Sequence, residues 1–122
     1  MEINQGDIFW FDAGEPRGSS PAYSRPVVVI QNNIFNRSPL GTVLACALTT
    51  NLRRAKAPGN VLLNEGETEL PKQSVIVVSQ VLTIDKSELI DKIGPLSKKR
   101  IDEILEGIKL LTEPREVDEE IE

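Results

Sequence analysis

Apolar residues gather in short, β-branched runs along most of the chain. The run at residues 27–30 is continuous and directly follows Arg25 and Pro26. A run this short and this rich in β-branched residues predicts a buried strand. Proline suits the first residue of a strand, where no ladder hydrogen bond is lost. Arg25 is therefore expected at the edge of the fold, where a scaffold can aim a charged side chain.

Four further runs predict strands, at residues 8–11, 42–49, 61–63 and 74–85. The last run is longer than an ordinary strand of about 5–6 residues, so we expect a bend or bulge around Ser79 and Gln80. Residues 86–92 predict one helical turn, after which residues 91–93 return to the sheet.

One segment has helical periodicity. Ser97 suits the N-cap, and Pro114 ends the helix. The apolar residues between them recur every three or four positions and form one stripe, which consists of Ile101, Ile104, Leu105, Ile108 and Leu111. We expect this stripe to pack on the barrel or on a second subunit. Several short strands with one late helix predict a mainly β (α+β) domain, a small barrel or sandwich with one added helix.

Two loops carry candidate binding residues. Residues 13–24 form a long link rich in Gly, Pro and Ser, in which Arg17 and Tyr23 suit phosphate and base contacts. Long loops of this kind are often functional, and a flexible linker here would isolate only a few residues. Residues 52–59 form a basic loop with Arg53, Arg54 and Lys56, for which a solvated surface loop is an equally good interpretation.

The charge of the chain is unevenly distributed. Of its 122 residues, 19 are acidic and 14 basic, for a formal net charge of -5. Residues 112–122 hold six acids and one base, so the remaining 13 acids and 13 bases balance over residues 1–111. We therefore expect one domain, residues 1–111, followed by an acidic tail, and the low net charge does not argue against a local basic groove.

The residue types restrict the possible chemistry. The chain has no histidine, so acid–base chemistry must use carboxylates, Lys, Tyr or Arg. Cys46 is the single cysteine and lies in an apolar run, which favours a core residue in a reducing compartment over a nucleophile or a zinc ligand. No signal peptide and no membrane span are expected.

Arg25 begins one predicted strand and Thr49 ends the next. If the two strands are antiparallel neighbours, both residues lie at the same edge of the sheet. A guanidinium fork beside a hydroxyl suits a phosphate group. With RNA, whose own 2′-hydroxyl is the nucleophile, positioning and charge stabilisation would be enough for strand cleavage. Simple phosphate binding fits the residue pattern equally well.

Six stretches, taken in order, resemble the MazF/PemK family of toxin endoribonucleases from type II toxin–antitoxin systems. They are residues 6–12, 17–19, 24–32, the strand end at Thr49 with residues 54–56, residues 79–86 and residues 91–96. The resemblance extends from residue 4 to about residue 110.

This resemblance implies a small SH3-like antiparallel β-barrel with a C-terminal helix (CcdB/MazF-like), assembled as a cytoplasmic homodimer. It implies sequence-specific cleavage of single-stranded mRNA to a 2′,3′-cyclic phosphate and a 5′-hydroxyl, with no metal and no cofactor. The implied partner is a cognate MazE-like antitoxin that covers the RNA groove and joins the toxin in binding DNA. Arg25 and Thr49 match the family's catalytic arginine and threonine.

Further residues are expected to contact RNA or to assist the reaction. The RNA-binding candidates are Arg17, Ser19, Ser20, Tyr23, Asn33, Phe35, Arg53, Arg54, Lys56, Ser79 and Gln80. Many family members have Glu or Gln where this chain has Ser20, so the general base is left open between Asp12 and Glu15. Because a guanidinium keeps its proton over the ordinary pH range, Arg25 is expected to stabilise charge. The alternatives are a CcdB-like toxin that binds gyrase and a nonenzymatic RNA-binding barrel.

Overall fold

The computed structural model describes residues 1–12, 14 and 24–117. Its six strands form one antiparallel sheet in the order β4-β5-β3-β2-β1-β6. The strands are β1 (Asp7–Asp12), β2 (Ser24–Val29), β3 (Thr42–Thr49), β4 (Val61–Leu62), β5 (Val75–Asp85) and β6 (Leu89–Pro95). The helices are α1 (Asn33–Asn36) and α2 (Lys98–Thr112), with 3-10 turns η1 (Leu52–Lys56) and η2 (Lys86–Glu88).

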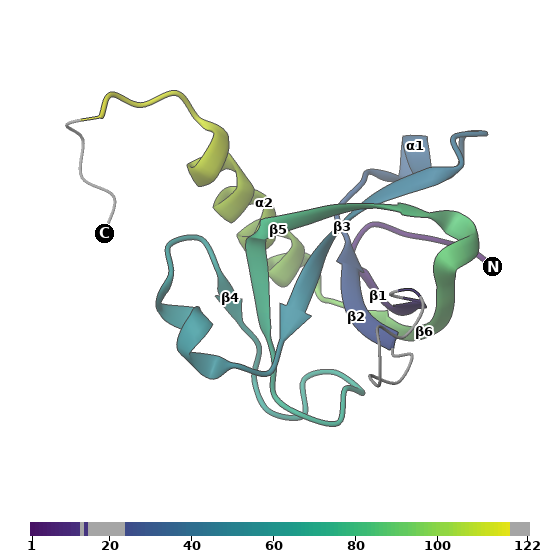
Figure 1. Cartoon of the computed structure of the whole chain (residues 1–122), viewed down its shortest axis with the longest axis horizontal. Helices are drawn as coiled ribbons and strands as arrows, with labels where there is room; N and C mark the ends of the chain where they lie inside the picture. Colours follow the sequence, from purple (N-terminus) through teal and green to yellow (C-terminus); the bar gives the residue numbers. More distant parts are fainter. Residues whose placement is uncertain (13, 15–23, 118–122) are drawn as a thin grey trace.

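The sheet is strongly curled. Figure 1 shows β5 sweeping across the molecule and β6 turning back to lie beside β1, with α2 on the outside. Because β4 and β6 are the two end strands of the sheet, the architecture is a half-barrel with a C-terminal helix. The mainly β fold predicted from the sequence is confirmed. No helix within the described part of the chain is long and apolar enough to span a membrane.

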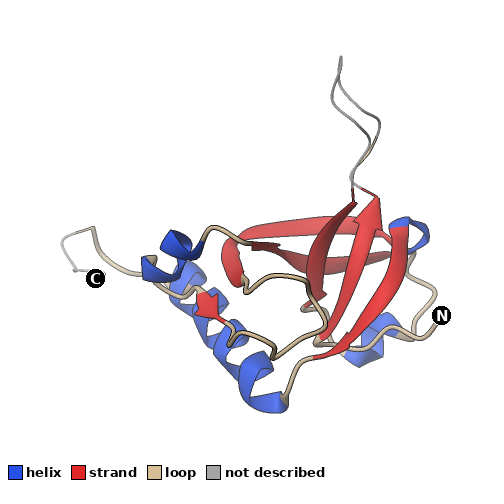
Figure 2. Cartoon of the chain, turned by 90° about the horizontal axis from the view of Figure 1, so that it is seen from below, coloured by secondary structure: helices blue, strands red, loops and turns tan. Residues whose placement is uncertain are grey.

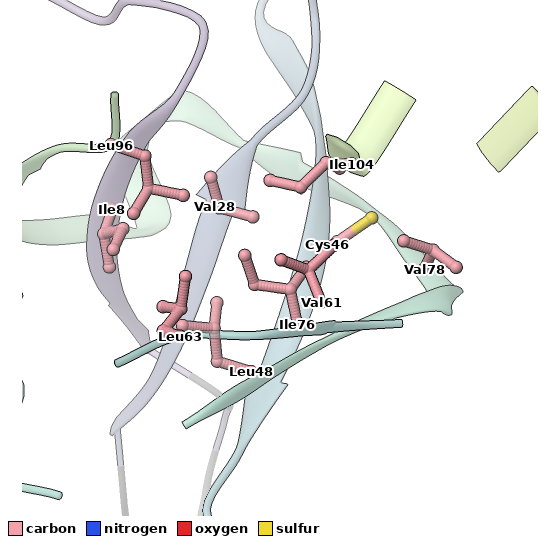
Figure 3. Packing of buried hydrophobic residues seen from close by; sticks show 10 residues of the cluster. All are labelled: Ile8, Val28, Cys46, Leu48, Val61, Leu63, Ile76, Val78, Leu96 and Ile104. Carbon is pink, nitrogen blue, oxygen red and sulfur yellow. The ribbon is translucent and has the colours of Figure 1, made fainter. Parts of the chain in front are cut away.

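The central strands β2 and β3 are buried on both faces over residues 27–29 and 45–48. Side chains of Val28 and Cys46 pack with Ile104 of α2 in one core cluster, which Figure 3 shows from close by. Val27, Val29 and Ala45 point to the other face and pack in a second cluster with Phe9 and Ile84. Alternate side chains thus enter different cores, which explains the continuous apolar runs in place of the alternation typical of antiparallel strands.

Strand β5 contains the predicted irregularity. Cys46 of β3 pairs with Val81 of β5, whereas the next residue, Ala47, pairs with Val77. Residues 78–80 of β5 are therefore extra residues opposite β3, as in a bulge, and they allow one long strand to follow the curl of the sheet. The expected helical turn at η2 and the return to the sheet in β6 are also confirmed.

Helix α2 begins and ends close to the predicted positions. The Ser97 side chain accepts a hydrogen bond from the backbone N–H of Arg100, and the helix ends at Thr112. Ile104 is buried, whereas Leu105 and Leu111 are 38% and 48% exposed, so the packing of the predicted stripe on the sheet does not extend to these two positions. Leu105 lies at the margin of the buried face, and the last turn of α2 extends beyond the sheet (Figures 1 and 2).

A backbone contact between two glycines joins α2 to the segment after η1. A Cβ placed on Gly107 would lie 2.2 Å from the carbonyl oxygen of Gly59, well inside van der Waals contact. Gly59 has a φ of 84°, which disfavours any other residue. The contact therefore requires glycine at both positions and holds η1 in a defined place beside α2.

We predict that Gly107→Ala destabilises the protein by about 1–3 kcal/mol, because the added methyl group overpacks the contact with Gly59. In an ordinary helix interior the same change stabilises by about 1 kcal/mol, so the expected sign is reversed. Urea denaturation measures the difference. The control is Glu106→Ala on the exposed face, and a Gly107→Ala variant as stable as the unaltered protein would contradict the prediction.

Candidate functional site

Arg25 and Thr49 lie together, as the strand order led us to expect. Strands β2 and β3 are antiparallel, with Val27 opposite Ala47, so the same register carries Arg25 at the start of β2 towards Thr49 at the end of β3. Both residues line the same two pockets. Antiparallel pairing of consecutive strands therefore builds a cation–hydroxyl pair at one edge of the sheet.

The larger of these two pockets has a volume of about 370 Å³. Its wall combines apolar groups, polar groups and one lysine. The lining residues are Trp10, Ser24, Arg25, Pro26, Leu48, Thr49, Thr50, Leu70, Pro71, Lys72 and Ser74. We call it the Trp10 pocket. Its size falls in the range of about 300–1,000 Å³ that is usual for small-molecule sites.

The smaller pocket has a volume of about 160 Å³ and shares Arg25, Leu48 and Thr49 with the first. Its other lining residues are Phe11, Ala47, Arg54, Gln80 and Leu82. We call it the Gln80 pocket. In β1, Trp10 pairs with Pro26 and Phe11 pairs with Arg25, and successive pairs face opposite sides of the sheet. The two pockets thus flank the Arg25–Thr49 pair from the two sides of the sheet edge.

The charge of the two pockets is positive. Arg25 lines both, Lys72 lines the Trp10 pocket and Arg54 lines the Gln80 pocket, and no carboxylate is among the lining residues that the structure describes. Asp12, a candidate general base, lines neither pocket, and its Oδ1 accepts a hydrogen bond from the backbone N–H of Gly14. The arrangement suits an anion such as a phosphate diester.

The basic segment after Thr49 is helical, so its prediction as a loop is wrong. The Asn51 side chain caps η1 by accepting from the N–H of Arg53, and Asn60 donates to the carbonyl of Arg54. This local capping gives residues 52–56 a defined turn. Arg54 reaches the Gln80 pocket, whereas Arg53 and Lys56 are exposed on η1.

The remaining RNA-binding candidates fall in different places. In the β5 bulge, Ser79 and Gln80 are both exposed, and Gln80 lines a pocket with Arg25. Arg17, Ser19, Ser20 and Tyr23 lie outside the described residues, as does Glu15, the other candidate base.

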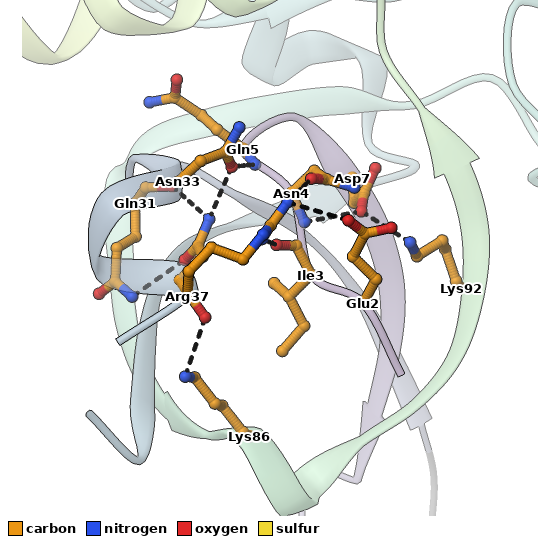
Figure 4. A network of polar contacts seen from close by, with 11 residues as sticks. Glu2, Ile3, Asn4, Gln5, Asp7, Gln31, Asn33, Arg37, Lys86 and Lys92 are labelled. Carbon is orange, nitrogen blue, oxygen red and sulfur yellow. Dashed lines mark hydrogen bonds and ion pairs between the residues drawn. The ribbon is translucent and has the colours of Figure 1, made fainter. Parts of the chain in front are cut away.

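Asn33 and Phe35 belong to α1, which follows β2 at the end opposite to Arg25. The Oδ1 atom of Asn33 accepts hydrogen bonds from the Gln5 N–H and from the Asn36 side chain (Figure 4). Arg37 also donates to the carbonyl of Ile3, so this network fastens α1 to the N-terminus. The structure does not bring Asn33 and Phe35 to the Arg25–Thr49 pair, and their contact with RNA stays a prediction.

Sequence reasoning missed Lys72, Leu70 and Trp10. Strand β5 is antiparallel to β3 and begins opposite its end, with Val75 paired to Thr49. The residues just before β5 must therefore lie near Thr49, by the same argument that placed Arg25. Strand order alone thus carried a signal for Lys72, which the acidic residues of the preceding loop obscured.

The segment that carries Leu70 and Lys72 is tied to α2 by a two-bond ion pair. Arg100 donates from Nε and Nη2 to the two carboxylate oxygens of Glu67, at 2.8 and 2.9 Å, and from Nη1 to Glu103 at 3.2 Å. Glu67 also accepts from the N–H of Asn64. The hydrogen bonds from Arg100 lower the pKa of the Glu67 carboxyl, and the same contact raises the pKa of the Arg100 guanidinium.

Other features of the surface and core fit this chemistry less well. A groove of about 630 Å³ lies between α2 and residues 59–61, but Asp102, Glu103 and Glu106 outnumber its one lysine, Lys99. Such a groove repels a polyanion. Burial raises the pKa of the Cys46 thiol to about 11, which keeps it protonated. Within the described ranges no group of three or more Cys, Asp or Glu side chains could hold a metal ion.

Comparison with known proteins shows which family this chain belongs to. Residues 4–112 match the family described as PemK-like, MazF-like toxin of type II toxin-antitoxin system. Endoribonuclease MazF6 of Mycobacterium tuberculosis is 40% identical over 109 residues, which cover 89% of this chain and 96% of the relative. Endoribonuclease EndoA of Bacillus subtilis is 36% identical over 111 residues, which cover 90% of this chain and 94% of the relative.

Solved structures show the same fold. MazF from Deinococcus radiodurans superposes with a TM-score of 0.70 at 18% identity, over 91% of this chain and 96% of that one. A mycobacterial endoribonuclease in complex with its cognate antitoxin superposes with a TM-score of 0.73 at 23% identity, over 93% of this chain and 98% of that one.

The fold is therefore a MazF-like half-barrel, in which Arg25 and Thr49 lie at one edge of the sheet. The chain belongs to the PemK-like, MazF-like toxins of type II toxin–antitoxin systems. Its homology to MazF6 and EndoA groups it with the endoribonucleases.

The ion pair between Glu67 and Arg100 predicts a pH-dependent contribution to stability. A carboxyl whose pKa is lowered on folding stabilises the protein fully above its ordinary pKa, about 4.3, and this contribution is lost as the pH falls through the folded value. We expect Glu67→Gln to cost about 1 kcal/mol at pH 7 and progressively less in acid.

The measurement is urea denaturation of both proteins between pH 7 and pH 3. Asp102→Asn, which removes the exposed pair with Lys98, serves as the control and should change stability little at any pH. If Glu67→Gln lowers the free energy of unfolding by the same amount over the whole pH range, the Glu67–Arg100 ion pair is not the source of the effect.

Proposed function

We propose that this chain is a toxin endoribonuclease that cleaves single-stranded mRNA at specific sequences without a metal ion. The observation that carries the proposal is the convergence of Arg25 and Thr49 at one sheet edge between two positively charged pockets. Family membership and homology to named endoribonucleases support it, and favour it over a gyrase-binding toxin or a nonenzymatic RNA-binding barrel.

The substrate supplies its own nucleophile. The 2′-oxygen of the nucleotide before the cleaved bond attacks the phosphorus, and the bond from phosphorus to the 5′-oxygen breaks. The 2′-hydroxyl loses its proton, and the leaving 5′-oxygen gains one, so the products are a 2′,3′-cyclic phosphate and a 5′-hydroxyl. Negative charge builds on the phosphate oxygens, where Arg25 donates two hydrogen bonds and the Thr49 hydroxyl a third.

Binding of the strand uses the basic rim and the two pockets. Arg53, Arg54 and Lys56 on η1 attract the phosphate backbone, a contribution that is independent of sequence. Sequence is read from unpaired bases that stack and form hydrogen bonds, for which Gln80 and the half-buried Trp10 are placed. An mRNA substrate puts this reaction in the cytoplasm.

The partner in this proposal is a MazE-like antitoxin. Structures of relatives are described as an endoribonuclease with its cognate antitoxin and as MazE-MazF. An acidic antitoxin segment complements the cations of the two pockets and would exclude RNA from them. The antitoxin would also supply the DNA contacts of the complex.

A homodimer is supported by exposed apolar side chains on the paired strands β3 and β5. Leu44 is 42% exposed and Val81 is 45% exposed. Val81 pairs with Cys46, two residues from Leu44, so alternation places both on one face of the β3–β5 pair. Exposed apolar groups that share a face favour burial against a second copy.

We predict cleavage of a mixed-sequence RNA in EDTA, with cyclic-phosphate and 5′-hydroxyl ends. Arg25→Ala and Thr49→Ala should each lower kcat by about 100- to 1,000-fold, the usual effect of removing a donor to a developing oxyanion. Electrophoresis with end analysis measures the products, and circular dichroism checks folding.

Arg115→Ala and Thr112→Ala are the matched controls and should retain full activity, because both residues are exposed and neither lines the Trp10 pocket or the Gln80 pocket. Cleavage that requires added metal would reject metal independence. Full activity of either site variant would reject its assigned role, and salt-sensitive binding without products would favour the nonenzymatic alternative.

We predict that Leu44→Asp converts the dimer to a monomer, because a charge in an apolar interface is costly to desolvate. Light scattering coupled to size-exclusion chromatography gives the mass in solution. Leu62→Asp, an equally exposed leucine on β4 near the other end of β5, is the control and should leave the dimer intact. An unaltered protein that is monomeric at micromolar concentration would refute the dimer.

A further inference from the structure

The Trp10 pocket is lined partly by a loop that has no role in the proposed chemistry of Arg25 and Thr49. Leu70, Pro71 and Lys72 line it together with Arg25 and Thr49 of the strand edge. These three residues belong to the connection between β4 and β5, residues 63–74, which contains no helix or strand. The pocket therefore has one wall built by the sheet and one wall built by a loop.

The chemistry of the loop wall suits one nucleotide of a single strand. Leu70 and Pro71 offer an apolar surface to a base, in a pocket that the indole of Trp10 and the ring of Pro26 also line. Lys72 adds a second cation to the pocket, besides Arg25. A pocket that combines apolar and aromatic side chains with two cations fits a base together with its phosphate.

The loop wall is held in place from outside the pocket. Arg100 binds both carboxylate oxygens of Glu67, and its side chain is only 14% exposed, as expected for an ordered ion pair. Leu70 packs against the core cluster beneath α2, and Gln73 donates to the carbonyl of Leu63. The Arg100–Glu67 pair is thus the polar attachment of this segment to α2.

We propose that residues 70–72 form the wall of a nucleotide-binding subsite beside the cleaved phosphate, in which Lys72 binds a substrate phosphate and Arg100 acts as a positioning residue through Glu67. The inference rests on the proposed RNA cleavage. Helix α2, which touches no substrate in this scheme, thereby influences which nucleotide is accepted. The effect should appear in substrate binding, since Arg25 and Thr49 are held by the sheet.

The first test is the salt dependence of RNA binding. The probe is an RNA with a 2′-deoxy nucleotide at the mapped cleavage position, so that it binds without reacting. We expect Lys72→Met to weaken binding for all sequences and to lower the slope of log K against log salt by about 0.7, the value for one phosphate contact on a single strand. Methionine keeps the apolar stem of the side chain.

Lys99→Met, an exposed lysine on α2 in the acidic groove, is the matched control and should leave the slope unchanged. An unchanged slope in Lys72→Met would overturn the role of Lys72. If the unaltered protein cleaves no RNA, the proposed function fails. If it cleaves RNA and Lys72→Met binds it normally, only the present inference fails.

The second test separates positioning from general stability. With RNAs that differ only in the nucleotides flanking the cleaved bond, Arg100→Gln and Glu67→Gln should each raise KM several-fold and relax the base preference at one position. The value of kcat should change less than twofold. Because both changes break one attachment, the double variant should have the KM of either single variant. Arg100→Lys keeps the positive charge and should have a smaller rise in KM than Arg100→Gln.

Glu103→Gln is the control, because Glu103 contacts Arg100 but belongs to α2 and not to the loop wall. All variants are compared at a temperature where circular dichroism shows them folded. Three results would each overturn the positioning role of Arg100. They are a fall in kcat as large as the rise in KM, additive effects in the double variant, and an unchanged base preference.

Discussion

The antiparallel register of β2 and β3 is the constraint on which the rest of the structure depends. Both strands are buried on both faces over residues 27–29 and 45–48, so their alternate side chains enter two different cores there. A slip of one residue would exchange the two sets of side chains and would be opposed by both cores. The same register that satisfies the cores also places Arg25 beside Thr49, so the packing of the domain and the geometry of the site are set by one interaction.

The second level of organisation is the contact of α2 with two loops. Gly107 approaches the backbone of Gly59, which follows the basic turn η1, and Arg100 binds Glu67, which precedes the wall of the Trp10 pocket. Both contacts lie on the side of α2 that faces the sheet. One helix thus locates the basic rim and the loop wall relative to the strand edge between them, although it contributes no side chain to either pocket.

Much of this architecture was predictable because it depends on local patterns. Short β-branched runs mark β2, β3 and β5, and Ser97 marks the start of α2. The placement of Arg25 beside Thr49 needed only the assumption that consecutive strands pair. The predicted stripe on α2 is covered by the sheet at Ile104 but not at Leu105 and Leu111, because the buried residues of the helix are Ile104 and Gly107. Helical periodicity identifies a face but not the extent of the surface that covers it.

By itself, the sequence determined which segments are strands, where the one long helix begins, and which cation and hydroxyl lie at the strand edge. These features follow from side-chain shape and alternation within a few residues. Only the tertiary structure decided that Trp10 and Leu70 share a pocket with Arg25, and that Arg100 is tied to Glu67. These relations join residues far apart in the chain, and they depend on how the sheet curls and where α2 packs on it. No local pattern encodes that geometry.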